Sequence, residues 1–249
     1  MSSPDVSPLT NRPRAVAIVI AGFIGFLAGQ VLALLLIALG AALAHYPGGL
    51  GAIGRSLAPP WWANATGLVG VWCGFAAAIF YAYREGRLSP WPHQWRPRRS
   101  DVGYVVLGVA AQFVIDAAYA PFHFKSLSRP VNHLFQSAHG LGFALVALLT
   151  TFVAPFFEEW LFRGVIFRAV AEGTPGSRRR AVALAVVASA ALFALAHGEP
   201  LQFFGLFALG ALLALVAWRT RRLVPSYLAH ASFNAVALVA VVAQRASHS

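Results

Sequence analysis

The chain is poor in charged residues and in cysteine, and each shortage excludes a class of protein. Charged residues make up 11% of its 249 residues, whereas soluble proteins average about 25%, so a soluble globular domain is excluded. A single cysteine, Cys73, allows neither an intrachain disulfide nor a metal site built from several thiolates. Because Cys73 lies within an apolar run, we expect it to be a small core residue.

Long apolar runs dominate instead. Hydrophobic residues make up 59% of the chain, and the mean hydropathy is +0.68. A membrane-spanning helix needs about 20 such residues, and seven runs qualify. They cover residues 15–44, 61–83, 101–120, 140–172, 181–197, 201–218 and 225–243. The sequence therefore predicts an all-α fold, a polytopic transmembrane helix bundle with about seven spans and room for partial or interfacial helices.

The positive charges lie between these runs and alternate from one connector to the next. The net charge is +11, and the basic segments are the amino terminus and residues 84–99, 178–180 and 219–222. Under the positive-inside rule this pattern places the amino terminus in the cytoplasm and the carboxy terminus outside. We therefore interpret the arginines as topology signals that contact the lipid bilayer, not as a nucleic-acid site. The composition, rich in alanine and arginine, indicates a bacterial inner membrane.

The fourth predicted span carries two adjacent carboxylates and an arginine. A charge in the middle of a bilayer costs at least about 2.5–3.5 kcal/mol on insertion scales, so Glu158, Glu159 and Arg163 must be paired, hydrated or functional. Glu159 and Arg163 are four residues apart and share a helix face. Glu158 is turned about 100° from Glu159, so we expect it to face another surface and to remain free to handle a proton.

Two further spans repeat the spacing of four residues. Phe193 and His197 lie near the end of the fifth span, and His230 and Asn234 lie on the seventh. A lone histidine in a membrane is more often an interhelical hydrogen-bonding group than a catalyst. Three helices that each carry such residues instead predict one shared, hydrated pocket inside the bundle.

The residue types in this pocket suit amide hydrolysis. A carboxylate base such as Glu158, together with His197, can activate water, while His230 and Asn234 can donate hydrogen bonds to an oxyanion. A divalent metal such as zinc is the alternative, held by Glu158, His197 and His230. The His-Glu-x-x-His arrangement of many zinc peptidases is absent from the sequence, so a cofactor is allowed but not indicated.

Together these motifs resemble a known family, the CPBP intramembrane proteases, which include CAAX proteases and bacteriocin-processing enzymes and are also called the Abi family. The similarity covers residues 140–243. The family signatures EExxxR, FxxxH and HxxxN are present as Glu158, Glu159 and Arg163, then Phe193 and His197, then His230 and Asn234.

The resemblance implies a membrane-embedded endopeptidase of the glutamate type, without a metal, that cleaves a peptide or membrane-protein substrate near the membrane surface. It implies that Glu158 and His197 activate the water and that His230 and Asn234 form the oxyanion site, supported by Glu159, Arg163 and Phe193. A non-hydrolytic immunity or regulatory protein that binds a partner through the same pocket is the alternative.

The resemblance and the charge pattern together suggest three parts of the chain. Residues 1–14 are expected to form a disordered cytoplasmic tail. Residues 15–130 are expected to form amino-terminal transmembrane helices, and residues 131–245 the catalytic transmembrane core, because the three motifs all lie in this last part.

Overall fold

The structure, a computed structural model, describes residues 12–56, 58–86, 88–123 and 129–247. Within these ranges every regular element is helical, and seven helices are long and apolar enough to cross a membrane. The predicted fold class is therefore confirmed, and the chain is an integral membrane protein. Most of the predicted tail, residues 1–11, lies outside the described residues, while residues 12–14 already belong to the first helix.

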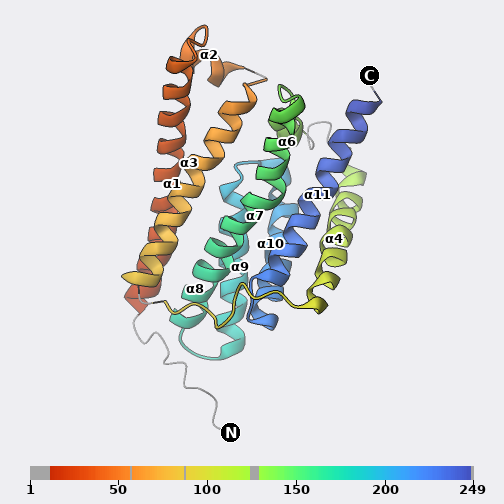
Figure 1. The fold of residues 1–249 in the computed structure, drawn as a ribbon. Helices are drawn as coiled ribbons and strands as arrows, with labels where there is room; N and C mark the ends of the chain where they lie inside the picture. Colours follow the sequence, from red (N-terminus) through yellow and green to blue (C-terminus); the bar gives the residue numbers. More distant parts are fainter. Residues whose placement is uncertain (1–11, 57, 87, 124–128, 248–249) are drawn as a thin grey trace.

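The amino-terminal part contributes three membrane spans. The elements are α1 (Arg12–Leu43), α2 (Gly49–Arg55), α3 (Trp61–Arg84), η1 (Arg99–Val102), α4 (Gly103–Tyr119), η2 (Ala120–Phe122) and α5 (Arg129–Phe135). The short helices α2 and α5 are the partial helices for which the prediction left room. Figure 1 shows α1 and α3 side by side at one edge of the bundle and α4 at the opposite edge, packed on α11.

Helices α1 and α3 approach each other through glycines. Gly25 and Gly29 of α1 face Gly70 and Gly74 of α3, and a methyl group added at Gly74 would collide with the carbonyl of Gly25. Each helix thus carries two glycines four residues apart on the contact face, which is the small-residue spacing that lets membrane helices pack backbone to backbone. The sequence prediction did not use this spacing.

The exposure of Cys73 on α3 corrects the expectation of a core residue. Its side chain faces outward, while Trp72 and Gly74 beside it are buried. The apolar run that suggested a core position is apolar because both lipid and protein surround α3, so hydrophobicity alone does not tell the two sides apart.

The carboxy-terminal part contributes four spans. The elements are α6 (Gly140–Leu148), η3 (Leu149–Val153), α7 (Ala154–Glu158), η4 (Glu159–Phe167), α8 (Arg168–Gly173), α9 (Arg178–Ala196), η5 (Pro200–Gln202), α10 (Phe203–Thr220) and α11 (Val224–Ala246). The first five follow without a break, so residues 140–173 form one long helical span. Within it, η3 and η4 are π-helical, a rare geometry that often marks functional sites.

The connector between α3 and α4 crosses beneath the bundle at the end where α1 begins and α3 ends (Figure 1), which we call the basic end. The carbonyl of Gln94 accepts a hydrogen bond from the backbone N–H of Leu223, 2.8 Å away, at the start of α11. Arg222 and Asp101 form a buried ion pair. The connector thereby covers the start of α11, and Arg222, Leu223 and Val224 are buried.

Candidate active site

Glu159 and Arg163 form an ion pair at the centre of the carboxy-terminal bundle. Nη1 of Arg163 lies 2.8 Å from Oε1 of Glu159, and both side chains are fully buried. Nη2 of Arg163 donates to the carbonyl of Gly210 on α10, 3.2 Å away, and the guanidinium lies 4.5 Å from the ring centroid of Phe193 on α9. The pair predicted from the spacing is present, and it also ties η4 to two other helices.

His230 of α11 lies between both glutamates. Its Nδ1 is 3.0 Å from Oε1 of Glu159, and its Nε2 is 3.6 Å from Oε2 of Glu158. Because a carboxylate oxygen that already accepts from Arg163 acts as an acceptor, Nδ1 is the donor in this contact. The imidazole is buried, whereas the side chain of Glu158 is 16% exposed. One imidazole thus lies between a fully buried carboxylate and a partly exposed one.

The two glutamates approach one imidazole at its two different nitrogens, so the surfaces that they face meet at His230. Glu158 ends α7 and Glu159 begins the π-helix η4. The division of roles survives in another form, because Arg163 contacts Glu159 while Glu158 is the more exposed carboxylate.

Phe193 brings the second imidazole to this group. Its ring contacts His230 edge to face at a centroid distance of 5.4 Å and His197 at 4.7 Å. His197 follows the last turn of α9 and is exposed, and its Nδ1 lies 2.8 Å from the carbonyl of Phe193. A carbonyl only accepts, so Nδ1 donates, and Nε2 is the nitrogen that a neutral His197 offers to water.

Asn234 lies one turn beyond His230 on α11 and is half-buried. Its Nδ2 donates to the carbonyl of Thr150, 3.0 Å away, in the π-helix η3. Within the described residues, neither Asn234 nor His197 makes a direct hydrogen bond to either glutamate. The structure thus places Glu158, Glu159, Arg163, Phe193 and His230 in contact, with His197 and Asn234 at the edges of this group.

Two further features of the site, a hydrogen bond of Ser189 and the π-helical segments, were not predicted. The hydroxyl of Ser189 on α9 donates to the carbonyl of Phe162 in η4 at 2.8 Å, and both residues are buried. A polar residue within an otherwise apolar span was the available signal for Ser189. The π-helical geometry of η3 and η4 left no signal in the composition, because residues 149–153 and 159–167 do not differ in type from α-helical sequence.

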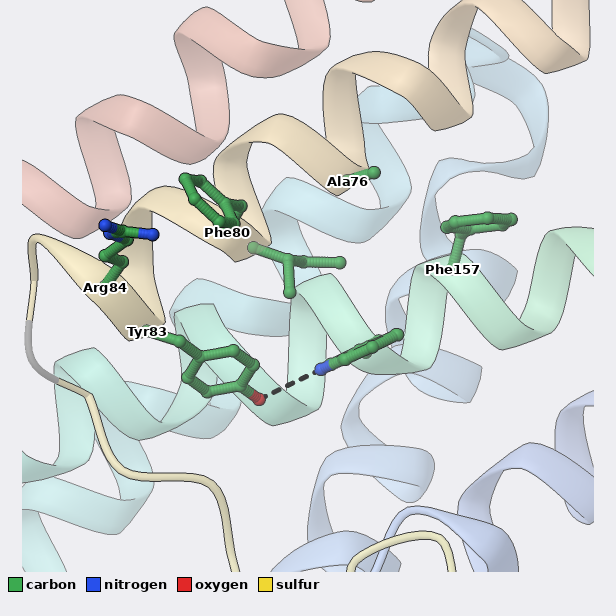
Figure 2. Close-up of a pocket in the computed structure, with 7 residues that line it drawn as sticks. Ala76, Phe80, Tyr83, Arg84 and Phe157 are labelled. Carbon is green, nitrogen blue, oxygen red and sulfur yellow. Dashed lines mark hydrogen bonds between the residues drawn. The ribbon is translucent and has the colours of Figure 1, made fainter.

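An apolar groove of about 380 Å³ opens between α3 and the α7–η4 segment, and neither glutamate is among its lining residues. Ala76, Phe80 and Tyr83 line one wall and Phe157 the other, with Arg84 at one end (Figure 2). The remaining lining residues are Ile79 and Trp160. The indole N–H of Trp160 donates to the hydroxyl of Tyr83 at 3.0 Å, drawn as a dashed line in Figure 2.

The arrangement does not fit the zinc ligands that the sequence left open. Zinc in proteins takes three or four nitrogen, sulfur or oxygen ligands around one point. Within the described residues, no group of three histidine, cysteine, aspartate or glutamate side chains lies close enough to hold a metal ion. Glu158 and His230 approach each other, but Nδ1 of His197 contacts the Phe193 carbonyl instead.

Comparison with known proteins identifies the same part of the chain. Residues 140–236 match the family described as Type II CAAX prenyl endopeptidase Rce1-like, and this range contains all three motifs. No curated protein and no solved structure matches the chain. The resemblance inferred from the motifs is confirmed, and with it a CAAX-type intramembrane protease as the general kind of protein. Residues 140–236 are thus similar to the Rce1-like family of type II CAAX prenyl endopeptidases.

Proposed function

We propose that the chain is an intramembrane endopeptidase of the glutamate type in which Glu158 is the general base. The observation that carries this proposal is the position of His230, which contacts the sealed Glu159 on one side and the partly exposed Glu158 on the other. A structural ion pair needs only Glu159 and Arg163. It gives no reason for a second carboxylate on the same imidazole, where water has access.

In the proposed reaction, Glu158 takes a proton from a water molecule held with the help of Nε2 of His197. The water oxygen bonds to the carbonyl carbon of the scissile peptide, and the electron pair of the C=O bond moves onto the oxygen. His230, when both of its ring nitrogens carry a proton, donates from Nε2 to this oxyanion, and the remaining amide N–H of Asn234 also donates to it; each donor contributes about 3–4 kcal/mol. The C–N bond then breaks as Glu158 returns the proton to the leaving amine.

Glu159 and Arg163 act by positioning His230. Their ion pair is fully buried, so it fixes the ring through Nδ1 without contact with water. Orienting an imidazole through its second nitrogen is a common device in catalytic sites, because the ring then keeps one direction for the reacting nitrogen. We propose that Phe193 has a related role, since its ring contacts both imidazoles.

The apolar groove supports a substrate that approaches from within the bilayer. Phe157 and Trp160, which line the groove, flank Glu158 and Glu159 in the chain. We propose that a hydrophobic part of a peptide or membrane-protein substrate lies in this groove, on the segment that also carries Glu158. From the alternation of basic connectors we further propose a bacterial inner membrane, with the amino terminus in the cytoplasm.

The test compares the newly formed peptide termini of membrane proteins in cells that express the wild-type chain or the variant Glu158→Gln. Glutamine keeps the shape of the side chain but cannot accept the proton, so the termini that depend on the wild-type chain should disappear. General-base catalysis contributes typically 10²–10⁴-fold, and a loss of this size is expected in the rate at which those termini form.

Glu85→Gln provides the matched control. Glu85 is an exposed carboxylate just after α3, so the same chemical change there should leave the termini unaltered. The abundance of each variant in the membrane is measured in parallel. Termini that persist in a well-expressed Glu158→Gln variant would refute Glu158 as the base.

A further inference from the structure

Three arginines gather around two tryptophans at the basic end of the bundle. The guanidinium carbons of Arg221 and Arg178 lie 3.8 and 4.9 Å from the ring centroid of Trp218. Those of Arg168 and Arg221 lie 5.2 and 5.8 Å from the centroid of Trp91. We call these five residues the arginine–tryptophan cluster. Its arginines come from three separate elements, the start of α8, the start of α9 and the residue that follows α10.

The cluster has more positive charge than the protein balances. Glu172 pairs with Arg168 at 2.8 Å, and it is the one carboxylate in contact with the cluster among the described residues. Arg168 is 5% exposed, and its Nε and Nη1 have no hydrogen-bond partner in the part of the chain that the structure describes. Buried guanidinium donors are normally paired, so this site has unused capacity for an anion.

Helix α9 adds to the imbalance. Its first turn carries Arg178, Arg179 and Arg180 and no acidic residue, although the partial positive charge of a helix N-terminus disfavours cations and attracts anions. The arrangement lowers the stability of the helix unless a negative charge lies nearby. A run of arginines at this position therefore indicates an anion that comes from outside the chain.

The backbone of Arg221 is also unusual. Its φ of +54° lies in the left-handed region, which is uncommon and unfavourable for residues other than glycine. Partial loss of hydration, and then repulsion from Arg178 and Arg168, lower the pKa of Arg221, while Glu172 opposes this change. The fold thus holds this cation beside two others against both the backbone preference and the repulsion.

We propose that the arginine–tryptophan cluster binds the phosphate of an anionic phospholipid head group. The cluster lies where three membrane spans meet the water, because the spans end at Gly173 and Thr220 and begin at Arg178. Head-group phosphates lie at this level, and basic pockets between membrane helices recognise them. Tryptophan rings suit the same interface, and guanidinium groups suit phosphate because they donate two parallel hydrogen bonds.

The site is separate from the proposed catalytic group but lies on the same span. Arg168 directly follows η4, which carries Glu159 and Arg163. A phosphate bound at Arg168 would therefore hold the end of the helix that positions His230. This link is a consequence of the chain order and does not depend on whether the chain cleaves peptides.

The experiment measures lipids retained by the purified full-length chain in nanodiscs of phosphatidylcholine, with or without phosphatidylglycerol, by native mass spectrometry. The wild-type chain should retain phosphatidylglycerol in preference to phosphatidylcholine. Each arginine that contacts the bound phosphate is expected to contribute about a fivefold preference for anionic lipid. Arg178→Gln and Arg221→Gln should each reduce the ratio of retained lipids by roughly this factor. Both residues are exposed, so these variants are expected to fold.

Arg179→Gln is the control, because it removes the same charge from the same helix end but lies outside the cluster. Its ratio of retained lipids should equal that of the wild type. Equal retention of both lipids by the wild type, or an equal loss with Arg179→Gln, would show only a general surface charge and overturn the proposal. So would a thermal stabilisation in detergent by inorganic phosphate as large as that by phosphatidylglycerol, because the ligand would then be soluble phosphate.

Discussion

The α1–α3 pair and the helices around Glu159 associate within the same bilayer by different means. None of the described side chains of α1 and α3 that are buried is polar or charged, and their contact depends on glycines such as Gly25 and Gly74. The helices η4, α9, α10 and α11 instead meet around Glu159, Arg163 and His230, which are all buried. Close backbone packing and interhelical hydrogen bonds are the two ways in which membrane helices associate.

The difference distinguishes the helices that carry the candidate active site from the α1–α3 pair. The glycine contacts of α1 and α3 demand a small residue but no polar group, whereas a buried ion pair is expensive and needs every partner in place. The family match covers residues 140–236 and omits α1 and α3. The matched range therefore contains Glu159, Arg163 and His230 and none of the glycines through which α1 and α3 pack. Each prediction below removes one element from one of these two regions.

The largest loss of stability is expected for Arg163→Met. The variant removes the cation and leaves Glu159 buried beside His230 without its partner. Breaking a buried ion pair from one side typically costs about 3–5 kcal/mol. We expect the free energy of unfolding to fall by about this amount, measured by denaturant titration of the purified chain in detergent micelles.

A double variant separates this cost from simple loss of packing. Glu159→Gln combined with Arg163→Met removes both charges, so most of the lost stability should return, since replacement of a whole buried pair by neutral groups is often tolerated. An Arg163→Met variant as stable as the wild type would show that the polar network does not hold these helices together.

A smaller loss of stability is expected for Gly74→Ala in the α1–α3 pair. The added methyl group would collide with the backbone of α1, so the helices must move apart, and overpacking of this kind costs about 1–3 kcal/mol. Gly67→Ala on the same helix is the matched control, because its methyl group would meet only the side chain of Ile37 at 3.6 Å. Thermal unfolding in detergent should separate the two variants, and equal melting temperatures would contradict glycine packing.

Much of the fold could be predicted from the sequence because hydropathy reports lipid contact directly. The predicted span of residues 61–83 differs from α3 by one residue, and that of residues 225–243 lies within α11. Hydropathy does not tell which face of a span meets protein, and this is why Cys73 was misplaced. The division of the chain at residues 14 and 130 stays a prediction.

The candidate site was predictable only in part, for a geometric reason. The spacing of Glu159 and Arg163 predicts their ion pair, because residues four apart share a helix face. The contact of Glu158 with His230 joins two spans, η4 with its preceding helix α7 on one side and α11 on the other, and the π-helical geometry of η4 was likewise not predicted. Both are set by packing between helices, through contacts such as that of Gln94 with Leu223, and neither is encoded in a local pattern.

The smallest loss of stability is expected for Ser189→Ala, a substitution within the polar region. The hydroxyl of Ser189 donates to the carbonyl of Phe162 within η4, so its loss removes one neutral hydrogen bond, worth about 1 kcal/mol, and no charge. We expect a fall of about this size in the free energy of unfolding, well below that of Arg163→Met. Ser189→Cys is the control, because it keeps a small buried group with a weaker donor and should fall between alanine and the wild type. If Ser189→Ala instead destabilises the chain as much as Arg163→Met, the π-helix itself, and not the ion pair, is the element on which the polar region depends.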